Sequence, residues 1–357
     1  MIIGLDKERK AEILMEKRKL FLWIIAGIPL FILAIPQVAL AYLEPGTMSY
    51  FLQILIAAFC GMLYAVRVFW NKIKESMRNL YSEWKSWGRR DPRLGKDEAK
   101  GIIIAAGRGS RLGPLTEDIP KCLLKINGKT LLEKQLEVFN QNQIKAISVI
   151  KGYKQEKINL PGITYFMNSN YEKNNILHSL MCAESVMNGA FIATYADIIF
   201  SSDIMARLNK VQVDMALVVD TDWQENYTDR SHHPENEAEK VIFDDRGLVV
   251  EIGKTLTQSY RERNHGEFIG MMRCSNRGAE IFRKHFHQAR ADFKGKAFIQ
   301  AKDFEKAYLT DFIQYMVNQG ERVECLLIQG GWHEIDTLED MQRIEAMSVG
   351  GRLRIGF

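Results

Sequence analysis

The chain has 357 residues, of which 26% are charged and 46% are hydrophobic, and its formal net charge is +4. Such a small positive excess does not support a nucleic-acid partner, which calls for a strongly basic surface. The cysteines (Cys60, Cys122, Cys182, Cys274 and Cys325) are scattered and form no C-x-x-C pair. This argues against a zinc site or a disulfide framework and fits a reducing compartment.

Two long apolar segments lie near the N-terminus. Residues 20–43 contain no charged residue, and residues 48–70 form a second apolar run that is interrupted only by Arg67. Each segment is long enough to cross the ~30 Å hydrocarbon core of a bilayer as a helix. Only Glu44–Thr47 separates them. We therefore expect a transmembrane helical hairpin over residues 20–70.

The charges on either side of this hairpin predict its direction. Basic residues crowd the segment 1–19 and follow the second span, whereas the connecting loop has none. The positive-inside rule therefore places both termini, and everything after the hairpin, in the cytoplasm. Residues 42–50 resemble a segment of small bacterial membrane hairpins, which implies a bacterial-type inner membrane. The alternative is a cleaved signal peptide, since Ala39-Leu40-Ala41 has the small residues of a cleavage site.

Residues 71–99 link the hairpin to the rest of the chain. They mix basic residues with Tyr81, Trp84 and Trp87 before several glycine and proline positions. Aromatic side chains beside Lys and Arg suit the headgroup region of an anionic leaflet. A solvated helix that continues from the second span is the alternative.

The strongest functional signal lies at residues 101–121. Residues 102–104 are all isoleucine, which is typical of a buried strand, and they lead into the glycine-containing loop 105–110. In α/β proteins such a loop brings backbone N–H groups up to a phosphate. Arg111 and Lys121 follow, and two cations suit a triphosphate whose negative charge grows during the reaction. The spacing matches neither a P-loop nor a dinucleotide-binding loop.

Residues 105–116 together with Pro120-Lys121 resemble the signature of the nucleotidyltransferase superfamily with the sugar-nucleotide pyrophosphorylase fold, roughly A-A-G-x-G-x-R-[LM]-x-P-x-T followed by P-K. The resemblance covers residues 100–346 and leaves residues 347–357 as a tail. It implies that Arg111 and Lys121 are catalytic, that a nucleoside triphosphate is bound with Mg²⁺, and that the loop holds its phosphates through Ala106, Gly107, Arg108, Gly109 and Ser110. The alternative, a strand-to-helix turn of another α/β protein, leaves both cations unexplained.

Strand and helix patterns alternate after Lys121. The apolar spacing predicts helices over residues 129–143 and 171–187, and strands over residues 146–150, 164–167, 191–197 and 215–219. This alternation predicts an α/β fold, a mostly parallel sheet with helices on both faces, of the Rossmann-like, nucleotide-diphospho-sugar transferase-like kind. Ligands of such sheets bind at the carboxyl ends of the strands.

Asp197 and Asp336 are the candidate metal ligands. Asp197 ends a predicted strand, where a carboxylate can hold Mg²⁺ together with substrate phosphates. The family usually has a D-x-D or G-D context there, but Tyr195 stands two residues earlier in this chain. Asp336 lies in residues 331–337, GWHEIDT, which resemble the segment that returns a second carboxylate to the metal. Helix capping is the alternative for each aspartate.

Residues 168–180 resemble the segment of phosphocholine-type cytidylyltransferases that meets the base and the ribose. Asn174, Asn175 and Ser179 offer the donors and acceptors that a pyrimidine edge requires, so the resemblance favours CTP. Asparagine is also a good helix N-cap, which is the alternative. His178 is expected to be structural.

Residues 220–269 resemble the phosphocholine cytidylyltransferase-like branch more than the hexose-1-phosphate branch. The resemblance places Lys254 near the acceptor phosphate as a third catalytic cation, Lys240 as its second partner, and Glu267 near the acceptor headgroup. A carboxylate beside aromatic rings would suit a cationic amine, and the other candidates for this role are Trp223, Tyr227, Trp332 and Glu334. Aromatic residues that merely cover a loop are the alternative.

The pair His232-His233, with Glu235 and Glu237 nearby in the sequence, is a weaker metal candidate. Adjacent histidines in a polar loop rarely share one ion, so we expect no transition metal there.

These assignments predict a membrane-anchored enzyme that transfers CMP from CTP to a phosphorylated small alcohol or phosphonate and releases pyrophosphate. Phosphocholine, phosphoethanolamine and 2-aminoethylphosphonate are the acceptors considered. Two alternatives stay open: a hexose-1-phosphate nucleotidyltransferase that uses UTP or dTTP, and a non-catalytic membrane scaffold that binds nucleotide. The pattern gives no indication of the oligomeric state.

Overall fold

The computed structural model describes residues 98–349 except residues 229, 231 and 258. The predicted hairpin over residues 20–70, its flanking segments and the tail after residue 349 lie outside the described residues. Among the helices that are described, none has the length and apolar character needed to cross a bilayer.

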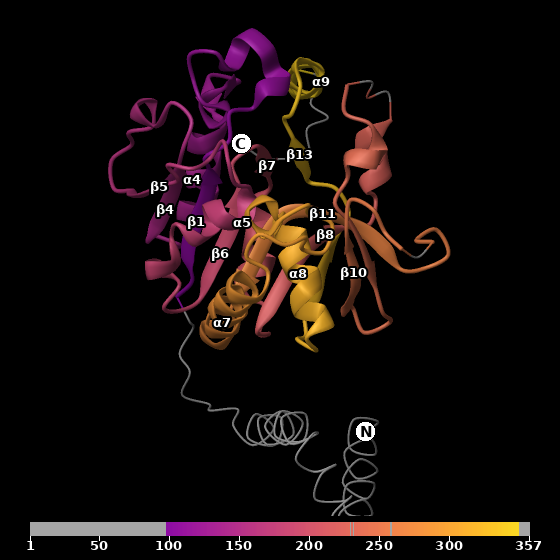
Figure 1. Cartoon of the computed structure of the whole chain (residues 1–357). Coiled ribbons are helices and arrows are strands. Elements are labelled where there is room, and N and C mark those ends of the chain that lie inside the picture. Colours follow the sequence, from indigo (N-terminus) through magenta and orange to yellow (C-terminus); the bar gives the residue numbers. More distant parts are fainter. Residues whose placement is uncertain (1–97, 229, 231, 258, 350–357) are drawn as a thin grey trace, which may run out of the picture. The chain divides into compact units, whose positions relative to one another are not determined.

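A nine-stranded sheet lies at the centre of the described domain (Figure 1). Its strands are β1 (Lys100–Ala105), β4 (Ile147–Lys151), β5 (Thr164–Met167), β6 (Phe191–Tyr195), β8 (Met215–Asp220), β9 (Lys240–Phe243), β10 (Val249–Gly253), β11 (His265–Cys274) and β12 (Glu324–Ile328). The main path runs β10-β9-β11-β6-β1-β4-β5, and β8 joins it by pairing with β11 and β12.

Most strands of this sheet run in the same direction. β5, β4, β1 and β6 are parallel neighbours, and β8 and β12 form a further parallel pair. β11 lies antiparallel between β6 and β8 and also pairs antiparallel with β9, while β10 runs antiparallel to β9. The expected mostly parallel α/β sheet is therefore confirmed, with one long antiparallel strand inside it.

Helices cover both faces of the sheet. They are α4 (Leu131–Gln141), α5 (Ile176–Met181), α6 (Ser202–Asn209), α7 (Asn276–Asp292) and α8 (Leu309–Asn318), whereas α9 (Leu338–Val349) contributes Ile344 to a separate small core with Ile126 and Ile199. Alternate residues of β1 point to opposite faces. Ile102 and Ile104 belong to a core that includes side chains of α5, α7 and α8, whereas Ile103 belongs to one with side chains of α4 and α6.

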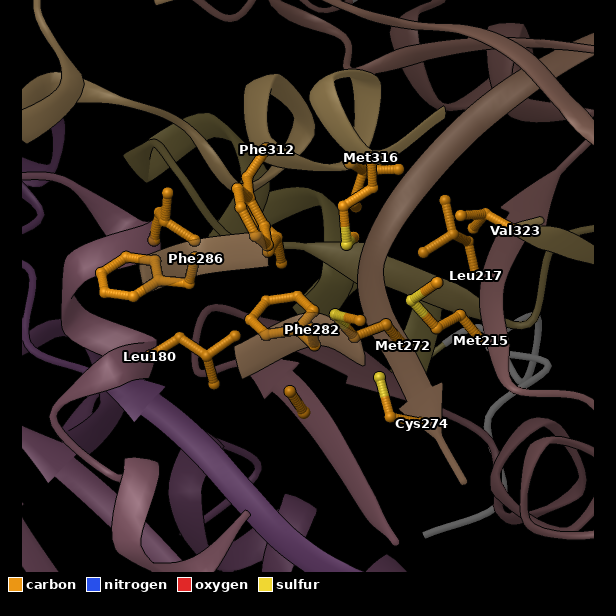
Figure 2. Close-up of a cluster of buried hydrophobic side chains, with 14 of the residues drawn as sticks. Leu180, Met215, Leu217, Met272, Cys274, Phe282, Phe286, Phe312, Met316 and Val323 are labelled. Carbon is orange, nitrogen blue, oxygen red and sulfur yellow. The ribbon is translucent and has the colours of Figure 1, made fainter. Parts of the chain in front are cut away.

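The first of these cores is rich in aromatic and sulfur-containing side chains. Figure 2 shows Phe282 and Phe286 of α7 and Phe312 of α8 in one cluster with Met272 of β11. The rings of Phe282 and Phe312 meet edge to face with centroids 4.9 Å apart. Burial of such large apolar surfaces supplies most of the driving force for folding. This core attaches α7 and α8 to the antiparallel part of the sheet.

The ends of two predicted helices differ from expectation. The helix expected from residue 129 begins at Leu131, because the Thr130 side chain accepts the N–H of Glu133 and the Glu133 carboxylate accepts the N–H of Thr130. The helix expected over residues 171–187 is much shorter. Only Ile176–Met181 is α-helical, since Asn175 caps it at the N-terminus and a short 3₁₀ turn follows the helix at Glu184–Val186.

Candidate active site

The glycine loop follows β1 and begins the site. Gly109 has φ 71°, and a Cβ atom there would lie 2.9 Å from Cβ of Lys121. Glycine is therefore required both for the backbone conformation and for the contact with Lys121. Thr116 secures the loop by donating from its Oγ1 to the Gly109 carbonyl at 2.9 Å.

Lys121 lies between the two predicted metal-binding carboxylates. Its Nζ donates to Oδ2 of Asp197 at 2.8 Å and to Oδ1 of Asp336. Asp197 follows β6 and Asp336 follows β13 (Trp332–Glu334), which pairs with β7 (Ile198–Phe200). This small two-stranded sheet brings the aspartates together although they are far apart in the sequence.

Electrostatics keep this cluster charged. Burial alone would lower the pKa of Lys121, but the carboxylates of Asp197 and Asp336 raise it overall. The pKa of Asp336 is lowered, because Lys121 and the hydrogen bond from His233 outweigh the effect of burial. Lys121 is 8% exposed and lines the site cavity, so its ammonium group is largely shielded from water.

The other two predicted catalytic cations join the same network. Arg111 donates to Oδ2 of Asp336 and, at 3.2 Å, to Oε2 of Glu237. Lys254 donates to the same Glu237 oxygen at 2.8 Å. Alternating charges therefore connect Lys121 to Lys254. The sequence analysis considered Glu237 only as a neighbour of the histidine pair and did not predict that it joins this charge network.

A cavity of about 240 Å³ has Lys121 in its wall. The predicted residues that line it are Ala106, Gly107, Gly109, Lys121, Asn174, Asn175, Ser179, Asp197 and Asp336. Tyr171 and Tyr195 also line it, and sequence reasoning did not place either in the site. Arg108 and Ser110 are not among the lining residues, and the Arg108 guanidinium lies 5.5 Å from the centre of the Tyr153 ring instead.

The asparagine-rich segment is held by its own hydrogen bonds. Asn168 is 3% exposed, and its Nδ2 donates to Oγ of Ser179 and Oδ1 of Asn174, both at 2.8 Å. Asn175 caps α5 and donates to the carbonyl of Lys306 at 3.1 Å. The capping alternative therefore holds for Asn175, which nevertheless lines the cavity as well. His178, as expected, packs against Phe304 in the core.

Two aromatic residues expected at the acceptor lie in the core instead. Trp223 is fully buried against Tyr227 and Tyr260. Trp332 is 4% exposed, and its Nε1 donates to Oδ2 of Asp220 at 2.7 Å. Neither is among the described residues that line the cavity. The rings of both residues pack inside the domain, so this placement does not support the predicted acceptor contact.

Glu267 is enclosed in the same region. It lies on β11, is 4% exposed, and accepts a hydrogen bond from the Tyr227 hydroxyl. Burial raises its pKa well above the usual range. An enclosed carboxyl group that already accepts a hydrogen bond from Tyr227 offers a headgroup little access, so the expected acceptor contact is not supported by this placement.

Lys240 and Lys254 line a second cavity of about 540 Å³ together with Thr255, Thr257 and Arg261. Lys240 is 7% exposed, and its Nζ donates to the carbonyls of Ala238 and Lys254 at 3.4 and 3.2 Å. Burial lowers its pKa. The two lysines thus share one cation-lined cavity, and Lys254 connects it to the catalytic network through Glu237.

The carboxylates near Lys121 fit a divalent cation. Oδ1 of Asp197 is buried without a hydrogen-bond partner in the part of the chain that the structure describes. Glu334 lies close by, and burial together with the charges of Asp336 and Asp197 raises its pKa to about 7. Oxygen ligands of this kind, beside a cavity for phosphates, are what Mg²⁺ prefers.

Comparison with known proteins identifies the family of the chain. Residues 101–250 match the model of the MobA-like NTP transferase domain. The chain is 30% identical over 252 residues to the CTP:phosphoglutamine cytidylyltransferase of Campylobacter jejuni, covering 68% of this chain and 97% of that protein. It is 32% identical over 107 residues to the choline-phosphate cytidylyltransferase of Streptococcus pneumoniae, covering 29% of this chain and 47% of that protein.

A solved structure has the same fold. The CTP:phosphocholine cytidylyltransferase of Streptococcus pneumoniae superimposes with a TM-score of 0.55 at 21% identity, over 70% of this chain and 99% of that one. The family is shown by the Campylobacter jejuni relative, which this chain matches over 97% of that protein's length at 30% identity. The chain therefore belongs to the nucleotidyltransferase family and is a nucleotidyltransferase enzyme.

Proposed function

We propose that this enzyme transfers CMP from CTP to a small phosphorylated acceptor and releases pyrophosphate. The observation that carries the proposal is Lys121, which lies between Asp197 and Asp336 beneath a glycine loop and beside a cavity lined by Asn174, Asn175 and Ser179. The names of the relatives, which act with CTP on phosphoglutamine and on choline phosphate, support the choice of nucleotide.

The reaction needs no covalent enzyme intermediate, because the acceptor oxygen is already ionised. That oxygen forms a bond to the α-phosphorus of CTP, while the bond to the α,β-bridging oxygen breaks and its electron pair leaves with pyrophosphate. The role of the protein is to position the reactants and to neutralise charge. Lys121 faces the α-phosphate, and the glycine loop with Arg111 holds the β- and γ-phosphates.

Asp197 and Asp336 are the residues that would hold Mg²⁺. Bound there, Mg²⁺ would polarise the α-phosphate oxygens and neutralise the charge that develops on them. Glu334 adds a third carboxyl group close to this pair. Arg111 and Lys121 already pair with the carboxylates in this structure, so the nucleotide phosphates would share these cations with the acidic residues.

The acceptor phosphate belongs on the side of Lys254. Lys254 and Lys240 line the second cavity, and Lys254 reaches the catalytic network through Glu237. A phosphate or phosphonate that binds Lys254 would present its oxygen towards Arg111 and Lys121. Because Glu267 is enclosed, it does not select an amine-bearing acceptor over other small phosphorylated acceptors.

The experiment is pyrophosphate release by the full-length chain, purified in detergent, with Mg²⁺. Each of CTP, UTP and dTTP is combined with phosphocholine, phosphoethanolamine, 2-aminoethylphosphonate, glycerol 3-phosphate and glucose 1-phosphate. We expect turnover that requires CTP and one of the non-sugar acceptors. Turnover restricted to glucose 1-phosphate with UTP or dTTP would replace this proposal with the hexose-phosphate one, and nucleotide binding without release would favour a scaffold.

We also propose that residues 20–70 anchor the enzyme in a bacterial-type inner membrane, with the catalytic domain in the cytoplasm. The proposal rests on the two long apolar segments, in which Arg67 is the one charged residue, and on the basic residues around them. Full-length protein should sediment with membranes and resist extraction at alkaline pH. Release into the supernatant under these conditions would refute the anchor.

A further inference from the structure

Arg230 is a buried arginine in the loop between β8 and β9, outside the groups assigned to the reaction. Its side chain is 5% exposed and that of Asp340 is 3% exposed. Nε of Arg230 donates to Oδ1 of Asp340 at 2.6 Å, and Nη2 donates to Oδ2 at 2.9 Å. Two parallel hydrogen bonds of this kind fix the relative orientation of both groups.

Asp340 in turn holds the backbone that carries Asp336. Its Oδ2 accepts the backbone N–H groups of Asp336 at 2.9 Å and Thr337 at 2.8 Å. The backbone N–H of Asp340 donates to Oγ1 of Thr337 at 3.2 Å. The turn between β13 and α9 is therefore fixed by Asp340, and the carboxylate of Asp336 projects from this turn towards Lys121.

His233, three residues after Arg230, contacts the Asp336 side chain itself. Its Nδ1 lies 3.2 Å from Oδ2 of Asp336 and 3.7 Å from Oε2 of Glu334. Because two carboxylate oxygens face this nitrogen, we assign the proton to Nδ1, which then donates to Asp336. The imidazole is 4% exposed, so this hydrogen bond is shielded from water.

The same atoms could be taken for a metal site, since one ligand atom from each of His233, Glu334 and Asp336 lies within 4.8 Å of the others. Arg230 argues against that reading. Its Nη2 lies 3.3 Å from Nδ1 of His233 and 3.5 Å from Oε2 of Glu334, so a guanidinium already supplies the positive charge there. The group is better understood as a support for Asp336.

We propose that Arg230, Asp340 and His233 are positioning residues that orient Asp336 for holding the divalent cation together with Asp197. The inference rests on the proposed function. Arg230 acts through Asp340 on the backbone of Asp336, and His233 acts on Oδ2 of Asp336, the oxygen that also accepts from Arg111. Removing a partner of a metal-binding group typically lowers metal affinity by about 10–100-fold.

The test measures Mn²⁺ binding to the full-length chain in the presence of the α,β-methylene analogue of CTP, so that the readout does not depend on turnover. Arg230→Gln and Asp340→Asn should each raise the Kd for Mn²⁺ by about 10–100-fold. His233→Leu should do likewise, whereas His233→Asn, which keeps a side-chain N–H close to the position of Nδ1, should restore much of the affinity.

Arg343→Gln is the matched control. Arg343 attaches the same loop to α9 by donating to the carbonyls of Asn226 at 2.8 Å and Glu225 at 3.2 Å, but no contact joins it to Asp336. We expect its Kd for Mn²⁺ to stay within about twofold of wild type. Thermal unfolding of every variant separates weaker metal binding from loss of the fold.

Unchanged Mn²⁺ binding in folded Arg230→Gln and His233→Leu would overturn the inference. Equal weakening in Arg343→Gln would overturn it too, because general anchoring of the loop would then explain the effect. Failure of the proposed function looks different: wild-type protein would release no pyrophosphate from CTP with any acceptor, or its Mn²⁺ binding would not respond to the CTP analogue.

Discussion

Lys121 is the residue on which the proposed chemistry depends most. Lys121→Met removes the ammonium group that faces the α-phosphate and leaves Asp197 and Asp336 to repel each other. Losing one preorganised charge-stabilising group typically costs about 10²–10³ in rate. We therefore expect kcat for pyrophosphate release to fall by that factor.

Lys125→Met is the control for this substitution, because Lys125 is exposed on the short strand β2 (Lys125–Ile126). It should retain wild-type kcat. Circular dichroism should show both variants folded. A Lys121→Met variant with normal turnover would remove Lys121 from the mechanism.

Glu239 gives the domain a predictable pH dependence. Burial raises the pKa of its carboxyl group to about 7, although Lys254 and the hydroxyls of Tyr195 and Thr310 oppose the shift. The folded protein thus holds this proton more tightly than the unfolded chain. The resulting stability is complete below the unfolded pKa and is lost as pH rises through about 7.

Glu239→Gln removes this titration and keeps a side-chain oxygen for one hydroxyl. As pH rises from 4.5 to 7.5, the free energy of unfolding of wild type should therefore fall relative to that of the variant. Urea unfolding at a series of pH values measures it. A difference that does not vary with pH would show that Glu239 does not titrate in this range.

For single residues, the sequence indicated the lysine and the two aspartates of the site but not the residues that pack around them. The structure brings Lys121, Asp197 and Asp336 together as expected, and the sequence pointed to them because a charge at a strand end or behind a glycine loop has few structural roles. Trp223 and Trp332 were expected at the acceptor but are buried, because an aromatic residue near a site and one in the core look alike in a single sequence. Arg230 gave no signal, since its partner Asp340 is 110 residues away.

The turn before α5 is an element whose hydrogen bonds serve the nucleotide cavity. Asn168→Ala removes the donor to Ser179 and Asn174, and both of these residues line that cavity. The turn should loosen against the helix. We expect KM for CTP to rise by about tenfold, the equivalent of one lost hydrogen bond of about 1.4 kcal/mol, with KM for the acceptor unchanged.

Asn170→Ala is a matched change in the same turn. Asn170 is exposed and only its backbone N–H donates to Asn168. Steady-state kinetics should therefore show KM for CTP close to that of wild type. A similar rise in both variants would mean that the turn, rather than the Asn168 side chain, sets the affinity.

Element boundaries were less predictable than element types. The apolar periodicity placed the strands of the parallel part within two residues, because buried strands of such sheets are nearly continuous apolar runs. A helix was expected over residues 171–187, but only Ile176–Met181 is α-helical. Its N-terminal part is a turn stabilised by asparagine side chains, a preference that periodicity does not register.

At the scale of the whole molecule, two apolar cores share one sheet. The β1 residues Ile102 and Ile103 belong to different cores, so the two faces cannot be loosened independently of the strand that carries the glycine loop. The layered architecture was predictable from the alternation of strands and helices. The position of β11 was not, because nothing local in the sequence marks a strand that pairs with segments far before it.

The position of β11 affects how the domain folds during synthesis. β11 (His265–Cys274) occupies the place between β6 and β8, yet it emerges from the ribosome after both. Until it arrives, β6 and β8 have an open edge facing each other across a gap one strand wide. A fragment that ends at residue 250, where the match to the family model also ends, should fail to unfold cooperatively and should aggregate. During synthesis, the catalytic domain should remain vulnerable to proteases until residue 328, the end of β12, has been added, because β12 completes the pairing of β8.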